Sequence, residues 1–470
     1  MTAARRIVVV GGGIAGLAAA HRLVELSRER GQNVELNLLE ARQRLGGTIA
    51  TERADGFLIE AGPDSFLSEK PWALALSERL GLTHRLVRTD DRFRKTFVVH
   101  RGRLHPLPEG FQLLAPARLA PLVTSRLFCW PGKLRMAMDL FLPRGAGAAD
   151  ESLGSFVRRR LGKEALERVA QPLVAGIYTA DPDQLSLAAT LPRFLELERR
   201  ERSLILALWR QSRRAPAQAK GVSGARWSLF VTFADGMDTL VGALAERLPT
   251  GSVRLGTPVA ALTRSGNRWR IAMASGEMLE ADGVVLAAEA HQSARIVRDL
   301  APDLAPLLGE IPYASSATVS LGYRREAIPQ SLDGFGFVVP RSERRPILAC
   351  TFSSVKYPGR APDGHALLRV FLGGALDEGV LKEEDESLVT IARGQLAELL
   401  GVTGPPLLTR IHRHPAAMPQ YRVGHLKLVA QIEEALARAP GLALAGSAYR
   451  GVGISDCVHS GEAAASRLLG

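Results

Sequence analysis

The chain has 470 residues, of which 46% are hydrophobic, and it carries a formal net charge of +12. One hydrophobic core does not support that length, so about two or three domains are expected. The sequence has no apolar run near the roughly 18 residues that a membrane-spanning helix needs, and no signal-peptide cleavage site follows Arg5 and Arg6. Its three cysteines form no CxxC pair, which favours a reducing, cytoplasmic location.

The positive charge is concentrated between residues 85 and 226, which contain 26 Lys and Arg against 13 Asp and Glu. The same segment contains apolar, proline-broken stretches at 111–123 and 140–143. Basic and apolar surface together is typical of contact with an anionic membrane, whereas a charge run alone is usually a solvated helical face. No basic motif with interleaved aromatic residues is present, so nucleic acid is not an expected partner. The sequence leaves the oligomeric state open, a homodimer included.

The N-terminal residues predict a strand, a tight turn and a helix. Residues 6–10 are apolar and β-branched, and residues 14–26 have helical spacing. Gly11, Gly13 and Gly16 between them form a GxGxxG motif. In such a motif the glycines allow the turn, the approach of a pyrophosphate and the packing of helix on strand, while the helix N-terminus faces the phosphates.

A second strand is predicted at 34–40, where Glu40 ends it. A carboxylate at this position accepts hydrogen bonds from ribose hydroxyls, and an acid rather than an arginine argues against NADP. The following segment, Glu40–Thr51, resembles the ExxxRxGGxxxT motif of glutathione-reductase-like and amine-oxidase-like flavoproteins. That resemblance implies FAD, which would extend past Arg44 and the paired Gly46 and Gly47.

The middle of the chain is predicted to be mostly helical, with the clearest helical patterns at 150–170 and 191–214. At the C-terminus, residues 441–469 repeat the order of strand, glycine-rich turn and helix. The helix that follows this turn can face the flavin ring. Strand patterns return after residue 226 and predict a mixed sheet of the substrate-domain type; they lie at 253–262, 269–272, 283–287, 317–323, 336–340 and 366–372.

The expected fold class is α/β and α+β. It comprises a Rossmann-like, glutathione-reductase-like FAD-binding domain, a mixed-sheet substrate domain and a helical domain that associates with a membrane if the basic region binds lipid. The predicted boundaries are 1–84, 226–300 and 426–470 for the FAD-binding domain, 85–225 for the basic helical domain, and 301–425 for the substrate-binding sheet.

Over essentially its whole length the sequence resembles the protoporphyrinogen and coproporphyrinogen oxidase family. The matching blocks are 56–66, 172–178, 349–354, 418–421 and 451–453. The resemblance implies aromatisation of a porphyrinogen by successive hydride transfers to FAD, with molecular oxygen as acceptor and hydrogen peroxide as product. Such chemistry depends on positioning and flavin electrostatics, so no catalytic acid, base or metal is predicted.

The substrate within this family is predicted to be coproporphyrinogen III, with protoporphyrinogen IX as the alternative. Plant and mitochondrial members have an arginine where this chain has Thr96, next to Lys95, and the blocks at 62–65 and 176–178 resemble the Gram-positive members better. An amine oxidase or a carotenoid desaturase would share the FAD motifs. From a different class, a non-catalytic, membrane-associated nucleotide-binding protein remains an alternative.

The resemblance also assigns site residues. Substrate contacts are expected from Gly176, Tyr357 and Phe371 in the cavity wall and from Lys70, which can pair with a substrate carboxylate. His412 and His414 share one face of a strand with no cysteine or carboxylate expected beside them, so they do not predict a metal site. The residues expected to bind FAD are Gly11, Gly12, Gly13, Ile14, Ala15, Gly16, Glu40, Ala41, Arg44, Gly46, Gly47, Thr48, Gly62, Pro63, Asp64, Ser65, Val259, Gly446, Gly451, Val452, Gly453 and Ile454.

Overall fold

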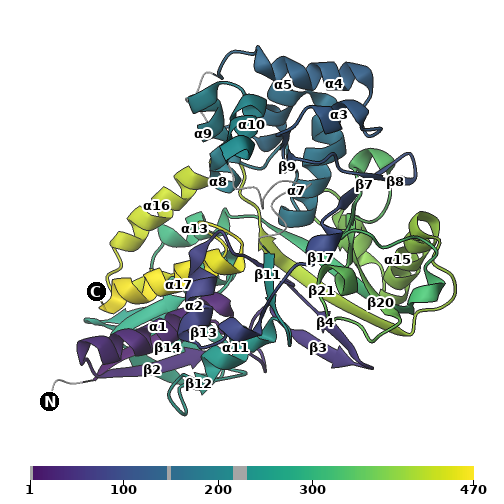
Figure 1. The fold of residues 1–470 in the computed structure, drawn as a ribbon. Helices are drawn as coiled ribbons and strands as arrows, with labels where there is room; N and C mark the ends of the chain where they lie inside the picture. Colours follow the sequence, from purple (N-terminus) through teal and green to yellow (C-terminus); the bar gives the residue numbers. More distant parts are fainter. Residues whose placement is uncertain (1–3, 146–149, 215–229, 470) are drawn as a thin grey trace.

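The computed structural model describes residues 4–145, 150–214 and 230–469 (Figure 1). It has a parallel sheet and a mixed sheet side by side, with a group of helices at one end of the molecule. The predicted mixed α/β architecture with a mixed sheet is therefore confirmed.

The parallel sheet has five strands in the order β12-β2-β1-β16-β22. Side chains alternate along β1, so that Ile7 and Val9 face one hydrophobic cluster while Val8 and Val10 face another. Burial on both faces explains why this strand is continuously apolar. The strands are β1 (Arg5–Val10), β2 (Val34–Leu39), β12 (Val253–Arg254), β16 (Gly283–Leu286) and β22 (Leu442–Leu444).

Helices cover one face of this sheet, and a small antiparallel sheet with further helices covers the other. The first face holds α1 (Ile14–Arg30), α2 (Pro71–Arg79), α11 (Asp238–Ala245) and α17 (Ile454–Leu469). The second face holds β13 (Val259–Ser265), β14 (Arg268–Met273), β15 (Met278–Ala281), α12 (Ala290–Ile296), α13 (Leu304–Gly309) and α16 (His425–Ala437). The N-terminal and C-terminal helices α1 and α17 pack against each other, which joins the two ends of the chain.

The mixed sheet has seven strands in the order β21-β17-β20-β19-β18-β7-β8, and only β18 and β7 pair in parallel. It contains β7 (Thr96–His100), β8 (Arg103–Pro106), β17 (Tyr313–Arg324), β18 (Gly336–Val338), β19 (Ala349–Phe352), β20 (His365–Gly373) and β21 (Leu408–Pro419). The short helix α14 (Ser353–Lys356) and the long helix α15 (Asp385–Leu400) accompany it. Smaller pairings involve β3 (Thr51–Ala54) with β4 (Phe57–Glu60), and β11 (Phe230–Phe233) with β5 (Phe66–Leu67) and β6 (Leu86–Arg88).

Three of the six strands predicted after residue 226 lie outside the mixed sheet, in the part of the chain, 226–300, that the predicted boundaries gave to the FAD-binding domain. The strand expected at 253–262 divides into β12, in the parallel sheet, and β13. The one at 269–272 pairs with β13, and the one at 283–287 is the buried β16 of the parallel sheet. Strand periodicity shows that a segment is extended, but the pairing partner depends on residues far away in the sequence.

The helical part lies above the sheets in Figure 1 and has its own hydrophobic cluster. The helices predicted within 150–170 and 191–214 are present. Residues 86–116 depart from the helical prediction, because they form short strands that include β7, β8, β9 (Phe111–Gln112) and β10 (Ala115–Pro116). The helices are α3 (Ala120–Thr124), α4 (Trp130–Ala137), η3 (Met138–Leu140), α5 (Leu153–Leu161), α6 (Lys163–Ala165), the π-helical η4 (Leu166–Ala170), α7 (Gln171–Tyr178), α8 (Leu187–Thr190), α9 (Pro192–Glu201) and α10 (Leu204–Arg214).

Within the described residues, none of the helices is both long enough and apolar enough to cross a bilayer.

Candidate functional site

The glycine turn after β1 needs glycine for two separate reasons. Gly11 has a φ of +106°, and a Cβ there would lie 2.7 Å from the carbonyl oxygen of Ala287. A Cβ on Gly16 would overlap the carbonyl oxygen of Gly11, so α1 packs on β1 only with glycine at this position. Gly13 differs from both, because the atom nearest to a Cβ added there would be the Cα of Gly47, 4.0 Å away. The protein therefore leaves open space in front of Gly13.

The start of α1 is suited to bind an anion. Gly13 is its N-cap, and among the described side chains none caps the helix or places an acid in its first turn. The first N–H groups of a helix have no partner within the helix, so those of Ile14, Ala15 and Gly16 face outward at its positive end. Gly13 also bridges to Gly46, which brings the second glycine pair beside the first. This cradle fits the pyrophosphate of a dinucleotide.

Glu40 is buried next to the turn and is held in place by backbone donors. Its Oε2 accepts a hydrogen bond from the N–H of Gly12 at 2.6 Å, and its Oε1 accepts one from the N–H of Arg42 at 2.8 Å. The Glu40 carbonyl accepts from the N–H of Thr257 at 2.8 Å, which brings the start of β13 and Val259 to the same place. The carboxylate is thus fixed where a ribose would follow the pyrophosphate.

Arg44 binds its own loop. Its guanidinium donates to the carbonyl of Gly47 at 2.7 Å and to that of Ile49 at 3.1 Å. A Cβ on Gly62 would overlap the carbonyl oxygen of Thr48, so this loop and the Gly62–Ser65 segment touch through their backbones. Arg44 therefore fixes the shape of the loop that joins Glu40 to the paired glycines Gly46 and Gly47. Ala41 is the first residue of this loop.

Asp64 forms an ion pair with the buried Lys356, which the sequence did not predict. The Nζ of Lys356 lies 2.8 Å and 3.0 Å from its two carboxylate oxygens, and Ser65 donates to it at 2.6 Å. Burial opposes ionisation of Asp64, but Lys356 and Arg369 outweigh it and lower the pKa of this carboxyl to about 2. Asp64 therefore stays ionised at any physiological pH.

Arg369 fixes the backbone beside Asp64. It lies in the apolar β20, is 5% exposed and donates to the carbonyls of Ala61 at 3.1 Å and Gly62 at 2.7 Å. His414 approaches the same Ala61 carbonyl, with its Nε2 at 2.9 Å. A lone charge within the apolar strand pattern of residues 365–373 is the sequence signal that could have identified Arg369, since buried charges are rare unless they are paired.

Glu60 lies at the end of β4 in the same buried region. It accepts hydrogen bonds from the N–H of Met237 at 2.9 Å and the hydroxyl of Thr51 at 2.8 Å, while the nearest nitrogen of Arg360 is 4.0 Å away. Burial raises the pKa of Glu60 to about 7, against the smaller opposing effect of these partners.

This raised pKa predicts how stability depends on pH. The folded state holds the Glu60 proton more tightly than the unfolded state does, so stability is lost as pH rises from about 4.5 to about 7. Glu60→Gln cannot ionise and does not suffer this loss. We therefore expect the free energy of unfolding of Glu60→Gln, relative to that of the native chain, to increase by up to about 3 kcal/mol as pH rises across this interval. Urea unfolding of both proteins at pH 5 and pH 8 measures the difference. An equal difference at the two pH values would contradict the prediction.

The C-terminal turn lies close to the N-terminal half of the site. Gly451 has a φ of +138°, and its N–H donates to the hydroxyl of Tyr421 at 2.7 Å. Tyr421 in turn donates to the carbonyl of Ser447 at 2.5 Å, which holds the loop before α17. The N–H of Gly446 donates to Ser460 at 3.0 Å. Gly453 and Ile454 follow at the start of α17, whose first turn faces β5.

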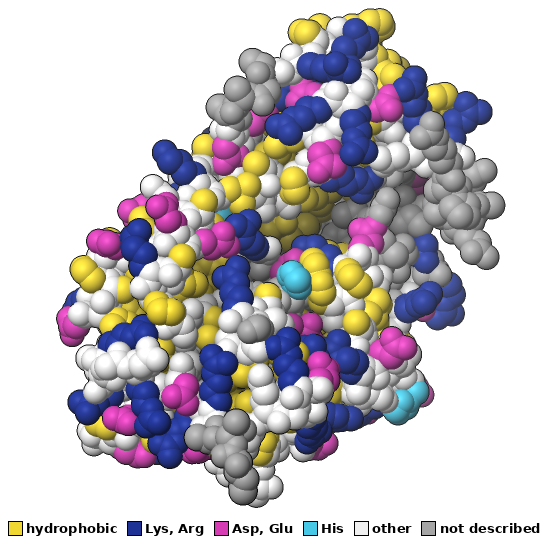
Figure 2. Space-filling view, turned by 90° about the vertical axis from the view of Figure 1, so that its left-hand side faces the viewer, with side chains coloured by type: hydrophobic (Ala, Val, Ile, Leu, Met, Phe, Trp, Pro, Cys, Tyr) yellow, Lys and Arg dark blue, Asp and Glu magenta, His cyan; other side chains and the backbone are white. Residues whose placement is uncertain are grey.

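The predicted substrate residues do not all lie in one wall. Phe371 and Val452 pack against the same hydrophobic cluster as Tyr178, which joins the mixed sheet, the C-terminal turn and α7. Gly176 is exposed, and a Cβ there would lie 4.0 Å from Val338. Figure 2 shows a hollow between the helical part and the rest of the molecule, with hydrophobic side chains on its wall.

Tyr357 and Lys70 lie outside this group. Tyr357 is 1% exposed and lies among the buried charges, with Lys356 and Arg360 over its ring. Lys70, the residue before α2, forms an ion pair with Asp456 at 2.7 Å. Asp456 was not among the residues predicted from the sequence, and no local pattern links positions so far apart.

The histidine pair differs from the expectation in one respect. A carboxylate does lie beside it, because the Oε2 of Glu52 is 3.9 Å from the Nε2 of His412. The described residues contain no group of three or more His, Cys, Asp or Glu side chains that could hold a metal ion.

Comparison with known proteins identifies relatives along the whole chain. The family model described as flavin containing amine oxidoreductase matches residues 14–469. The coproporphyrinogen III oxidase of Bacillus subtilis (strain 168) is 37% identical, covering 99% of this chain and 98% of that protein. The protoporphyrinogen oxidase of Bos taurus is 34% identical, covering 99% and 98%. The solved structure "Putative protoporphyrinogen oxidase from Exiguobacterium sp. 255-15" is 33% identical, with a TM-score of 0.87 and coverage of 100% of this chain and 99% of that chain.

These matches confirm the predicted resemblance, the FAD cofactor and the oxidoreductase class. The glycine cradle in front of Gly13 and the free N-terminus of α1 fit that cofactor independently of the comparisons. Since the family model and full-length relatives at more than 30% identity agree, this chain belongs to the flavin-containing amine oxidoreductases, among the porphyrinogen oxidases.

Proposed function

We propose that the chain oxidises coproporphyrinogen III to coproporphyrin III, with oxygen as the acceptor and hydrogen peroxide as the second product. The observation that carries this proposal is the 37% identity, over 99% of this chain, to a protein named coproporphyrinogen III oxidase. The site supports it, because partly buried apolar side chains of α7, β20 and the C-terminal turn, namely Tyr178, Phe371 and Val452, pack against one hydrophobic cluster. A large, flexible, apolar macrocycle needs an apolar wall of this kind.

FAD is proposed to lie across the Rossmann-like parallel sheet and to end between the two glycine-rich halves of the site. Gly11–Gly16 and the N-terminus of α1 bind the pyrophosphate, and Glu40 binds the ribose. The loop 41–48 and the segment 62–65 guide the cofactor toward the turn at 446–454. When bound, the flavin supplies the hydride acceptor.

The residues of the chain contribute binding and positioning. Phe371 and Val452 present an apolar surface that orients the macrocycle and excludes water from the reacting carbons. Asp64 stays ionised, and its pairing with Lys356 keeps a fixed dipole beside the backbone of Gly62 and Pro63. Lys70 offers a cation for a substrate propionate. None of these side chains needs to transfer a proton.

The substrate is tested by supplying each porphyrinogen aerobically to the purified flavoprotein and following porphyrin fluorescence. We expect a higher kcat/KM for coproporphyrinogen III than for protoporphyrinogen IX. The second candidate, protoporphyrinogen oxidation, is favoured by the 34% identity to the bovine enzyme of that name. Faster turnover of protoporphyrinogen IX, with coproporphyrinogen III hardly used, would reverse the assignment.

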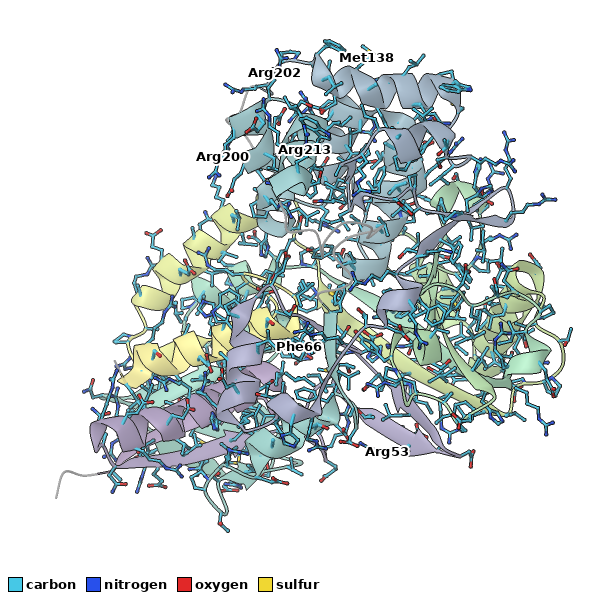
Figure 3. All side chains as sticks on the ribbon, in the orientation of Figure 1. Arg53, Phe66, Met138, Arg200, Arg202 and Arg213 are labelled. Atoms are coloured by element: carbon cyan, nitrogen blue, oxygen red, sulfur yellow. The ribbon has the colours of Figure 1, made fainter. Side chains whose placement is uncertain are left out.

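The helical part carries an exposed apolar stripe that supports peripheral contact with an anionic membrane. Four exposed apolar residues recur at helical spacing along α4, η3 and the residue after η3: Trp130, Leu134, Met138 and Phe141, with exposed fractions of 64%, 65%, 51% and 79%. We call these four residues the α4 stripe. They lie at the outer end of the molecule, where Figure 3 labels Met138 and Arg202, and Figure 2 shows Lys and Arg beside hydrophobic side chains there. Arg202 donates to the Leu140 carbonyl, which places one cation beside the stripe.

Of the α4 stripe, only Phe141 lies in the two apolar stretches that the sequence indicated, 111–123 and 140–143. The apolar stretch 111–123 is largely core, since Phe111 and Leu114 are fully buried and Leu122 is 2% exposed. Leu119, Ala120 and Val123 are the exposed residues of that stretch, and Phe141 lies in the second stretch. Both stretches are apolar in composition, and only the packing of the folded chain decides which of their residues are buried.

We expect Leu134→Ser with Met138→Ser to weaken binding to anionic vesicles by about tenfold, because each loses apolar area that lipid would cover. The control is Leu407→Ser with Met278→Ser, which changes the same residue types at 53% and 51% exposure outside the helical part. Flotation with vesicles containing phosphatidylglycerol measures both. Equal binding of the two variants would contradict a role of the α4 stripe.

A further inference from the structure

Lys70 and Asp456 form an ion pair between the start of α2 and the first turn of α17. The Nζ of Lys70 lies 2.7 Å from both carboxylate oxygens of Asp456. The side chain of Lys70 is 41% exposed, while that of Asp456 is 9% exposed. The lysine therefore faces solvent from a position fixed by a buried carboxylate.

Asp456 also lies directly below the C-terminal glycine turn. A Cβ on Gly451 would overlap its carboxyl carbon, and a Cβ on Gly453 would lie 3.1 Å from its Oδ2. Tyr178, which packs against the apolar cluster, lies near enough to feel this charge: burial and, next, Asp456 raise the pKa of Tyr178 to about 12. The pair thus lies between the turn at 451–453 and the proposed substrate wall.

We propose that Asp456 is a specificity-determining residue that neutralises Lys70, and that the pair sets both the affinity for substrate carboxylates and the ease of reducing the flavin. This inference rests on the proposed function, from which it takes the flavin beside the glycine turn and Lys70 as a carboxylate anchor. A lysine has three N–H donors, and two of them are directed at Asp456. One donor and little net charge remain for an incoming propionate.

The same pair acts on the flavin through charge alone. Reduction adds negative charge to the flavin, so a nearby carboxylate disfavours it and a nearby ammonium favours it. With both charges present the effects nearly cancel. Removing the Asp456 charge and removing the Lys70 charge should therefore shift the reduction potential of the flavin in opposite directions. Loss of a merely structural contact would not produce opposite shifts.

The test uses Asp456→Asn, Lys70→Met and the double variant as purified flavoproteins. The flavin reduction potential, measured by equilibration with a reference dye, is expected to rise in Asp456→Asn, to fall in Lys70→Met and to return near the native value in the double variant. Controls are Arg79→Met and Glu462→Gln, which remove a salt bridge between the same two helices away from the glycine turn. We expect no shift in either control.

Steady-state kinetics give the second readout. Asp456→Asn should lower KM for coproporphyrinogen III by about threefold to tenfold, because an unneutralised lysine attracts an anion more strongly, and the gain should shrink at high salt. Lys70→Met should raise KM more than it lowers kcat. If Asp456→Asn raises KM as Lys70→Met does, Asp456 only holds the lysine in place and the proposal is wrong.

Different results would contradict the proposed function and the proposed role of Asp456. Native protein that takes up no FAD, or that oxidises neither porphyrinogen, would overturn the proposed function. Native protein that binds FAD and turns over substrate, but whose variants shift the potential in the same direction or not at all, would overturn the role of Asp456 alone.

Discussion

Gly13→Ala is expected to yield a folded protein that purifies without yellow colour. The new methyl group meets only the Cα of Gly47, at 4.0 Å, so the apoprotein can accommodate it. That methyl group would occupy the open space in front of the α1 N-terminus, where the pyrophosphate is proposed to lie. A misfit of this kind costs up to about 3 kcal/mol, so FAD affinity should fall by about 100-fold. Flavin absorbance after reconstitution, together with circular dichroism, measures binding and folding separately.

Gly242→Ala is the matched control for this substitution. Gly242 lies in α11, and a Cβ there would meet nothing within 4 Å. It should bind FAD as the native chain does. Gly16→Ala should behave in a third way, because its methyl group overlaps the Gly11 carbonyl and disturbs the fold itself. Full FAD binding by Gly13→Ala would contradict the proposed path of the cofactor.

The glycine turn was predictable because its constraints are local. A positive φ at Gly11 and the contact between Gly16 and the Gly11 carbonyl involve residues close together in the chain. Glu40 follows from the same unit, since one strand and one helix fix its distance from the turn. The family, the cofactor and the oxidoreductase class came from such local blocks, and all three are confirmed.

The electrostatics of the site could not be predicted in the same way. Lys70 and Asp456 are 386 positions apart, and Lys356 and Asp64 are 292 positions apart. Each charge alone is compatible with a solvated surface, so its partner is known only once the chain has folded. Tyr357 shows the same limit for aromatic residues. The residues next to it in the sequence do not reveal whether it lines a cavity or is packed in the interior, where it lies with 1% of its surface exposed.

The prediction of sheet membership and of surface exposure from the sequence met a related problem. The pattern at 253–262 is strand-like throughout, yet β12 and β13 belong to different sheets. In the helical part, Phe111 is buried while Phe141 is 79% exposed. An apolar residue has the same hydropathy whether a neighbouring element covers it or not, so only the tertiary contacts decide its exposure.

Asp139→Ala is expected to destabilise the helical part by about 3 kcal/mol, because it removes the nearer of the two carboxylates beside the buried guanidinium of Arg160 and leaves only Glu198, 3.6 Å away. Asp139 is fully buried and Arg160 is 1% exposed, with Nε to Oδ1 at 2.7 Å. The other carboxylate oxygen accepts from Ser203 at 2.7 Å and from the N–H of Ile205 at 3.0 Å, so the substitution also releases the start of α10.

Asp183→Ala provides the control, since Asp183 pairs at 2.9 Å with Arg158, on the same helix as Arg160 but about half exposed. An exposed pair of this kind contributes only about 0–1 kcal/mol. Urea unfolding measures both variants, and hydrogen exchange locates the loss, which should appear in α5 and α10 and spare β1. Since Asp139 lies between Met138 and Phe141, the same variant should also bind vesicles less well. Native stability in Asp139→Ala would mean that Glu198, together with the carbonyls of Pro143 and Arg202, suffices to hold Arg160.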